Sequence, residues 1–185
     1  YFLWFNLLAI GVFGFFISVD LFTMFMFYEV ALIPMYLLIG VWGSGQKEYA
    51  AMKLTLMLMG GSALLLVGIL GIYFHSSTTG AFTMNLQEIA QAHAMPESLQ
   101  RWFFPLVFTG FGVLGALFPF HTWSPDGHAS APTAVSMLHA GVLMKLGGYG
   151  CFRVAIHLMP EAAKELSWIF IILTGISVVY GPYSA

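Results

Sequence analysis

Six long apolar stretches separated by short polar segments dominate the pattern of this chain. A bilayer core about 30 Å thick takes about 20 apolar residues per helix, so each stretch is a candidate membrane span. Backbone polar groups must be paired inside lipid, and the alternating strands of a membrane barrel are not visible, so the spans are predicted to be helices. The predicted fold class is an all-α membrane protein, a polytopic bundle. Its six predicted spans cover 1–19, 21–41, 50–74, 102–118, 132–158 and 166–180.

The polar links predict how successive helices connect. Asp20 alone separates the first two spans, which indicates a tight helical hairpin. The link 42–49 is an ordinary polar turn, whereas the link 75–101 is longer and contains 85–91, a candidate surface helix that begins from Asn85 as its cap. Glycines inside the spans are typical of close packing between membrane helices.

A proline-rich segment is predicted to interrupt the helical pattern. Pro119, Pro125 and Pro132 occur with Gly127 in 119–132, and such residues impose irregular backbone. Irregular backbone is tolerated at membrane depth where protein buries it or water lines it. We therefore predict a broken helix near 112–120, with irregular backbone continuing to Pro132.

Composition excludes a soluble globular domain. Of the 185 residues, 59% are hydrophobic and 8% charged, against about 45–50% and about 25% in soluble domains. The net charge of −2 offers no basic patch for a nucleic acid. Tyr1 lies within an apolar run and Ala185 follows another, so we expect residues 1–185 to be a single membrane domain within a longer protein.

Two ionisable residues lie near the middle of predicted spans. These are Glu29 and Lys145, and a charge at that depth costs about 2.5–3.5 kcal/mol on insertion scales. One interpretation is structural, as a buried ion pair or a neutral hydrogen-bonded group. The other is a proton relay, because burial favours the neutral forms of both groups and brings them closer to exchanging protons.

Lys53 and His139 are further candidates for a relay. Lys53 lies only four residues inside its span, so its stem could also extend to the membrane surface. His139 precedes Lys145 by six residues, which corresponds to different faces of one helix. A neutral core histidine and a proton shuttle both fit it.

Other kinds of site are not indicated. His121, Asp126 and His128 have no standard zinc spacing. His139 is the only histidine deep inside a predicted span, so a haem with two histidine ligands is not expected. There is no glycine-rich phosphate loop followed by Lys and Ser or Thr. We therefore expect no cofactor and no metal in this chain, and no small-molecule substrate other than protons.

Three motifs resemble the antiporter-like M subunit of respiratory complex I, the NADH-quinone oxidoreductase. They are FYEVALIPMY at 27–36, HTWSPDGH at 121–128 followed by APTA at 131–134, and LMKLGGYG at 143–150 followed by Arg153. Their order and spacing agree over almost the whole chain. The KLGGYG ending is more similar to the M type than to the related L and N types.

The resemblance implies a subunit of about fourteen helices with two inverted five-helix repeats, each holding a half-channel. This chain would supply helices four to eight, which form one repeat with its broken helix, and the start of helix nine. The implied function is proton translocation in the membrane arm, coupled to quinone reduction elsewhere in the enzyme. The implied partners are other membrane-arm subunits and the lipid bilayer, in a bacterial inner membrane or an organellar energy-transducing membrane.

The resemblance also assigns roles to individual residues. Glu29 matches the proton-pathway glutamate of helix five, Lys53 a lysine of helix six, and Lys145 the lysine of the central axis on helix eight. His139 matches a position where L-type relatives carry histidine. Leu114 occupies the place of the usual helix-seven lysine, the partner of the glutamate. We therefore expect Lys53 to approach Glu29 directly or through one water.

Alternatives to this function remain open from sequence. They are a related Mrp-type Na+/H+ antiporter, a subunit of a membrane-bound hydrogenase, and a membrane scaffold without transport, which the leucine at position 114 makes more plausible. The sequence does not distinguish H+ from Na+ as the coupled ion.

Overall fold

An antiparallel helical hairpin begins the bundle in the computed structural model, which describes residues 1–76, 82–92 and 95–184. Its helices are α1 (Phe2–Ile17) and α2 (Leu21–Trp42). Asp20 caps α2, because its carboxylate accepts hydrogen bonds from the Thr23 amide at 2.9 Å and the Thr23 hydroxyl at 3.0 Å. The tight hairpin predicted from this single polar residue is confirmed.

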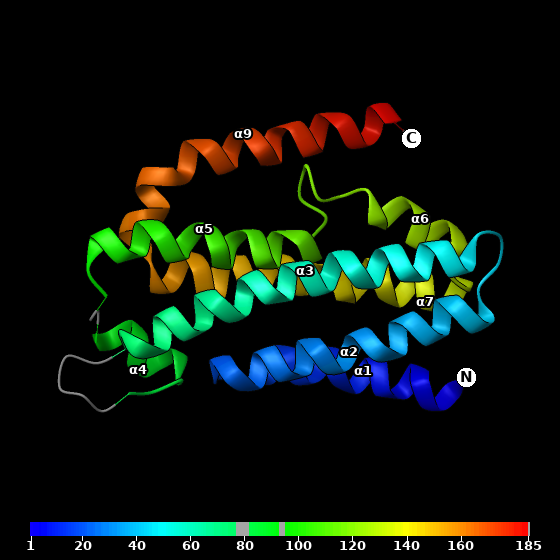
Figure 1. Cartoon of the computed structure of the whole chain (residues 1–185), viewed down its shortest axis with the longest axis horizontal. Helices are drawn as coiled ribbons and strands as arrows, with labels where there is room; N and C mark the ends of the chain where they lie inside the picture. The colour runs from blue at the N-terminus through cyan, green and yellow to red at the C-terminus, as the bar shows by residue number, and fades with distance from the viewer. Residues whose placement is uncertain (77–81, 93–94, 185) are drawn as a thin grey trace.

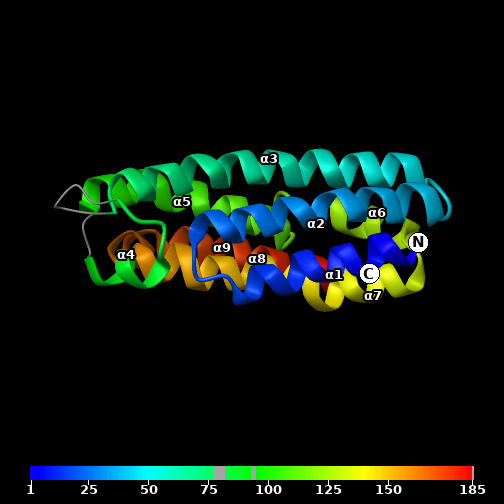
Figure 2. The ribbon, with the colours of Figure 1, turned by 90° about the horizontal axis from the view of Figure 1, so that it is seen from below.

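The longest helix, α3 (Lys47–Phe74), packs against α2 and α5 (Glu97–Leu114). Figure 2 shows α3 along one face of the bundle and α1 along the opposite face, with α2 between them. Close approach of α3 and α5 requires small residues, since a Cβ added at Gly110 would lie 2.9 Å from the Gly61 carbonyl oxygen. The predicted role of span glycines in packing is confirmed at this contact.

A short helix, α4 (Leu86–Ala92), lies between α3 and α5 in the chain. The Asn85 side chain accepts a hydrogen bond from the Gln87 amide at 2.9 Å, so the predicted Asn-capped helix is present. Backbone hydrogen bonds of 3.0 Å join Leu21 to Met84 and Leu86 to Val19. They fasten the segment before α4 to the turn between α1 and α2.

The predicted break follows α5. Helical structure stops at Leu114 and resumes in α6 (Trp123–Ser130), so the break covers 115–122, close to the predicted 112–120. The prediction of irregular backbone as far as Pro132 was wrong. Pro125 is the third residue of α6, in the first helical turn, where its missing N–H would have had no helical partner.

The indole N–H of Trp123 donates to the Val113 carbonyl at 3.1 Å, across the break. This hydrogen bond joins the start of α6 to the end of α5.

The predicted span 132–158 is one continuous rod. It consists of α7 (Thr133–Leu138), the π-helical segment η1 (His139–Leu143), α8 (Met144–Gly150) and a second π-helical segment, η2 (Cys151–Ile156). Short π-helical turns inside α-helices are frequent at functional sites. The rod contacts α5 through α8 and η2.

The last helix, α9 (Pro160–Ser184), lies beyond α5 at the outer edge of the bundle (Figure 1) and begins six residues before the predicted span 166–180. The Arg101 and Glu165 side chains form an ion pair of 2.6 Å between α5 and α9. Within the described residues, three helices are long and apolar enough to cross a membrane: Leu21–Trp42, Lys47–Phe74 and Pro160–Gly181. Large apolar side chains such as Phe2 and Phe152 are exposed. The prediction of an all-α membrane protein is confirmed.

Candidate functional site

Glu29 lies in the middle of α2 with an open acceptor position. Its side chain is half-buried, and its Oε1 is buried without a hydrogen-bond partner in the described part of the chain. The neighbouring Tyr28 is 1% exposed and donates to the Leu58 carbonyl of α3 at 3.0 Å. Pro34 leaves the Val30 carbonyl without the usual helical N–H donor. Glu29 therefore places a carboxyl group in the middle of a membrane-length helix, with one buried oxygen that has no hydrogen-bond partner among the described residues.

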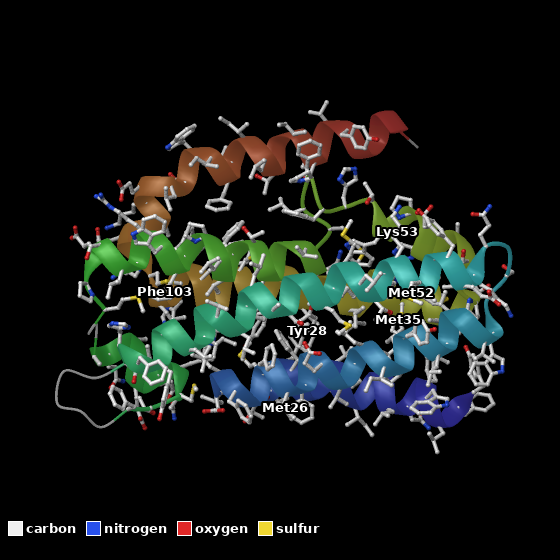
Figure 3. The ribbon with its side chains drawn as sticks, viewed as in Figure 1. Met26, Tyr28, Met35, Met52, Lys53 and Phe103 are labelled. Atoms are coloured by element: carbon white, nitrogen blue, oxygen red, sulfur yellow. The ribbon has the colours of Figure 1, made fainter. Side chains whose placement is uncertain are left out.

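Lys53 is paired with α6 rather than with α2. Its Nζ lies 2.6 Å from Asp126 Oδ2, and the two side chains are 24% and 42% exposed. Figure 3 shows Lys53 on the α6 side of α3, while Tyr28 lies on the α2 side. The expected direct pair between Lys53 and Glu29 is not found among the described ion pairs, because the helical α6 brings Asp126 over α3. The expected approach through one water stays a prediction.

His139 is enclosed by aromatic rings at the start of η1. It is 0% exposed, and neither ring nitrogen has a hydrogen-bond partner within the described residues. Its ring stacks on Trp123 at 5.3 Å and on His128 at 4.4 Å, with interplanar angles of 19° and 23°. Its burial agrees with both interpretations of this histidine, a core residue and a proton shuttle.

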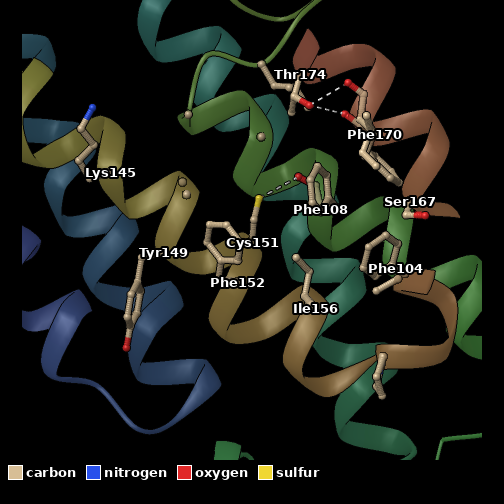
Figure 4. Close-up of a pocket in the computed structure, with 18 of the residues that line it drawn as sticks. Phe104, Phe108, Lys145, Tyr149, Cys151, Phe152, Ile156, Ser167, Phe170 and Thr174 are labelled. Carbon is tan, nitrogen blue, oxygen red and sulfur yellow. Dashed lines mark hydrogen bonds between the residues drawn. The ribbon is translucent and has the colours of Figure 1, made fainter. Parts of the chain in front are cut away.

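Lys145 is exposed in α8, although its depth in the predicted span suggested burial. It lies at the edge of a cavity of about 1160 Å³ between α9 and the surface of α5, α8 and η2 (Figure 4). Most of the lining is aromatic or apolar, including Phe104, Phe108 and Phe170. The neighbouring Leu146 and Gly147 are buried instead, so the helix turns Lys145 away from the packed interior.

The helix α6, which follows the break, contacts two of the four predicted relay residues. Asp126 and His128 of α6 contact Lys53 and His139 respectively. Among the described residues, neither Glu29 nor Lys145 forms an ion pair with these groups. Sequence reasoning considered Asp126 and His128 only as metal ligands and did not include them in the relay. Their spacing of two residues in a polar segment beside a break was the available signal.

Leu114 is packed in the interior at the end of α5. It is 0% exposed and belongs to the main apolar core. The position that carries lysine in the resembled family therefore holds a buried apolar side chain. In the described structure no ion pair forms with Glu29 either.

The chain matches an established transmembrane family and its named members. The match to the family described as "NADH:quinone oxidoreductase/Mrp antiporter, TM" covers residues 18–185. The "NAD(P)H-quinone oxidoreductase chain 4 3" of a Picosynechococcus species is 41% identical over 172 residues, which are 93% of this chain and 31% of the relative. The "NADH-quinone oxidoreductase subunit M" of Rickettsia bellii is 39% identical over 177 residues, 93% of this chain and 34% of the relative.

Solved structures of three membrane complexes contain a similar fold. Respiratory complex I from Thermus thermophilus matches with a TM-score of 0.83 at 28% identity, over 92% of this chain and 36% of the other. An archaeal membrane-bound sulfane sulfur reductase matches with a TM-score of 0.85 at 27% identity, over 96% of this chain and 36% of the other. The Mrp complex of a Dietzia species matches with a TM-score of 0.75 at 26% identity, over 90% of this chain and 31% of the other.

This chain thus spans about a third of the length of its relatives. Because the match extends over nearly the whole chain, and the most similar named relatives include M and chain 4 subunits, this chain belongs to the transmembrane NADH:quinone oxidoreductase/Mrp antiporter family as an M-type sequence.

Proposed function

We propose that this chain is part of a proton-translocating membrane-arm subunit of an NADH-quinone oxidoreductase. The observation that carries the proposal is the buried, unpartnered Oε1 of Glu29 in the middle of a membrane-length helix. A carboxyl group at this depth is costly to keep unless it serves a function. Relatives with this enzyme's name over 93% of the chain support the same assignment.

Within this proposal, Glu29, Lys53, His139 and Lys145 carry protons in steps, and redox chemistry belongs to other parts of the enzyme. Each can exist in a charged and a neutral form, and changes in nearby charge shift the balance between the two. The partners are other membrane-arm subunits and lipid. The α1 to η2 unit, with its break before α6, would form the first five-helix repeat of the longer subunit, and α9 would begin the next.

The proposal is tested with Glu29→Gln in the full-length chain. Inverted membrane vesicles are assayed for quinone reduction and for proton uptake, and the assembled complex is quantified. We expect normal assembly and strongly reduced proton uptake, since glutamine cannot exchange a proton at this position. Glu161→Gln, an exposed change at the start of α9, is the matched control. Normal proton uptake in Glu29→Gln would overturn the proposal.

Lys145→Ala separates transport from a structural role at the edge of the cavity. The lysine is exposed and has no ion pair within the described structure, so its loss should leave assembly intact. We expect reduced proton uptake. Failed assembly, with normal uptake by the remaining complex, would instead assign Lys145 a structural role.

A second candidate is an Mrp-type Na+/H+ antiporter, which the similarity to the Dietzia Mrp complex favours. Vesicles in sodium-free buffer distinguish the two, because an antiporter needs sodium for proton movement and a quinone-driven pump does not. The genes next to the full-length gene give a second criterion, since quinone- and NADH-binding subunits accompany only the first candidate.

A further inference from the structure

The stacked histidines of α6 and η1 form a group that the proposed relay does not yet explain. His139 is completely buried, and neither of its ring nitrogens has a hydrogen-bond partner in the part of the chain that the structure describes. A buried polar group without a hydrogen bond is costly and needs an explanation. Only one ring of the pair is anchored: the His128 Nδ1 and the Ser136 hydroxyl form a hydrogen bond of 2.9 Å.

We propose that His128 and His139 act together as one proton-holding unit, in which the half-buried His128 exchanges protons with water at the surface of α6. This inference rests on the proposed function and adds His128 to the residues that carry protons. The pair lies at the contact between α6 and η1, so it joins the helix after the break to the rod that carries Lys145.

The geometry limits the unit to one added proton. The ring centroids are 4.4 Å apart, and two imidazolium ions at that distance would repel each other. The Asp126 carboxylate is already paired with Lys53, so it does not compensate a second positive charge. One ring is therefore charged at a time, while the other stays neutral and is able to accept.

The transfer step follows from the stacking. Hydrogen bonds of an imidazole lie in its ring plane, so two rings inclined by 23° do not bond nitrogen to nitrogen. The imidazolium of one ring releases its proton to a bridging water, which protonates a free nitrogen of the other ring. Rotation of the His139 ring serves the same purpose. The pair keeps the same total charge, because one ring loses the proton that the other gains.

Access to the pair is through His128. Its side chain is half-buried, whereas His139 is 0% exposed. The order His128, His139 therefore leads from the partly exposed ring to the fully buried ring.

The test replaces each ring without removing its packing. His139→Phe keeps a flat ring against Trp123, and His128→Asn keeps a polar atom able to bond Ser136. Each is made in the full-length chain, and proton uptake per quinone reduced is measured in vesicles. We expect each single variant to lose proton uptake per quinone reduced, because the unit then lacks one of its two proton-accepting rings. The double variant should lower proton uptake per quinone reduced no further than either single variant, because both residues belong to one unit.

Matched variants make the outcome decisive. His157→Phe changes an exposed histidine at the end of the rod and should leave the ratio unchanged. Full proton uptake in His139→Phe would overturn the proposal, since stacking alone would then suffice. Uptake lost in Glu29→Gln but kept in both histidine variants overturns only this inference, whereas uptake kept in all three overturns the proposed function.

A measurement on the unaltered complex covers the case in which a variant does not assemble. Solid-state NMR of ¹⁵N-histidine in wild-type membranes counts protonated rings as pH is lowered. One protonated ring in the pair supports the proposal. Two protonated rings, or none over the pH range in which the enzyme works, would contradict it.

Discussion

The ammonium group of Lys53 on α3 contacts the carboxylate of Asp126 on α6 at 2.6 Å, just beyond the break in the chain. This ion pair and the Trp123 hydrogen bond to Val113 hold α6 against neighbouring helices. The pair thereby places the segment that carries His128 next to η1. It also gives Lys53 a partner other than Glu29.

Breaking this pair should affect transport more than stability. Both side chains are partly exposed, and such pairs contribute about 0.2–1 kcal/mol. We expect Asp126→Asn and Lys53→Gln each to lower the thermal stability of the purified complex only slightly, while proton uptake falls clearly. A double-mutant cycle on both readouts checks this. Additive effects of the two changes on proton uptake would show that the residues act separately.

The buried Leu114 should resist replacement by the lysine of the family. Its side chain is 0% exposed, and an ammonium group at membrane depth costs about 2.5–3.5 kcal/mol without a partner. Leu114→Lys should therefore reduce the amount of assembled complex, whereas Leu114→Met should be tolerated. Assembly is measured by native gel electrophoresis of solubilised membranes. Wild-type levels for Leu114→Lys would indicate that a polar partner, such as Glu29, lies within reach.

Two adjacent glycines of α8 should differ in their tolerance of a methyl group. A Cβ at Gly147 would collide with the backbone of Gly115, whereas a Cβ at Gly148 meets nothing within 4 Å. Gly147→Ala should lower the stability of the folded protein by about 1–3 kcal/mol through overpacking. Gly148→Ala should be neutral or slightly stabilising, because alanine favours helix. Thermal inactivation of the solubilised complex compares them, and equal losses would contradict the close contact of α5 and α8.

The helices could be predicted because backbone polar groups in lipid must be hydrogen-bonded within the protein, and a helix does this within one segment. The predicted span 21–41 differs from α2 by a single residue, since apolar length and the Asp20 cap define both of its ends. The helix α6 was missed because Pro125 and Gly127 are ordinarily helix breakers. Whether a proline interrupts a helix depends on the turn in which it lies, and its sequence position alone does not show this.

The candidate site could be predicted only in part. The depth of Glu29 in its span indicated a buried or half-buried carboxyl group, whereas the expected partner Lys53 pairs with Asp126 instead. Depth could not show which way Lys145 turns, because that depends on which face of the rod packs against α5. The contacts of Lys53 with Asp126 and of His139 with His128 depend on the path of the chain after the break, which sequence periodicity does not determine.

In the proposed function, Glu29 gains and loses a proton as the enzyme works. Infrared difference spectroscopy of the full-length complex, triggered by NADH and compared between wild type and Glu29→Gln, tests this directly. We predict a protonated-carboxyl band that changes during turnover in wild type and is absent from Glu29→Gln. Identical difference spectra for the two proteins would contradict it, because Glu29 would then keep one protonation state throughout.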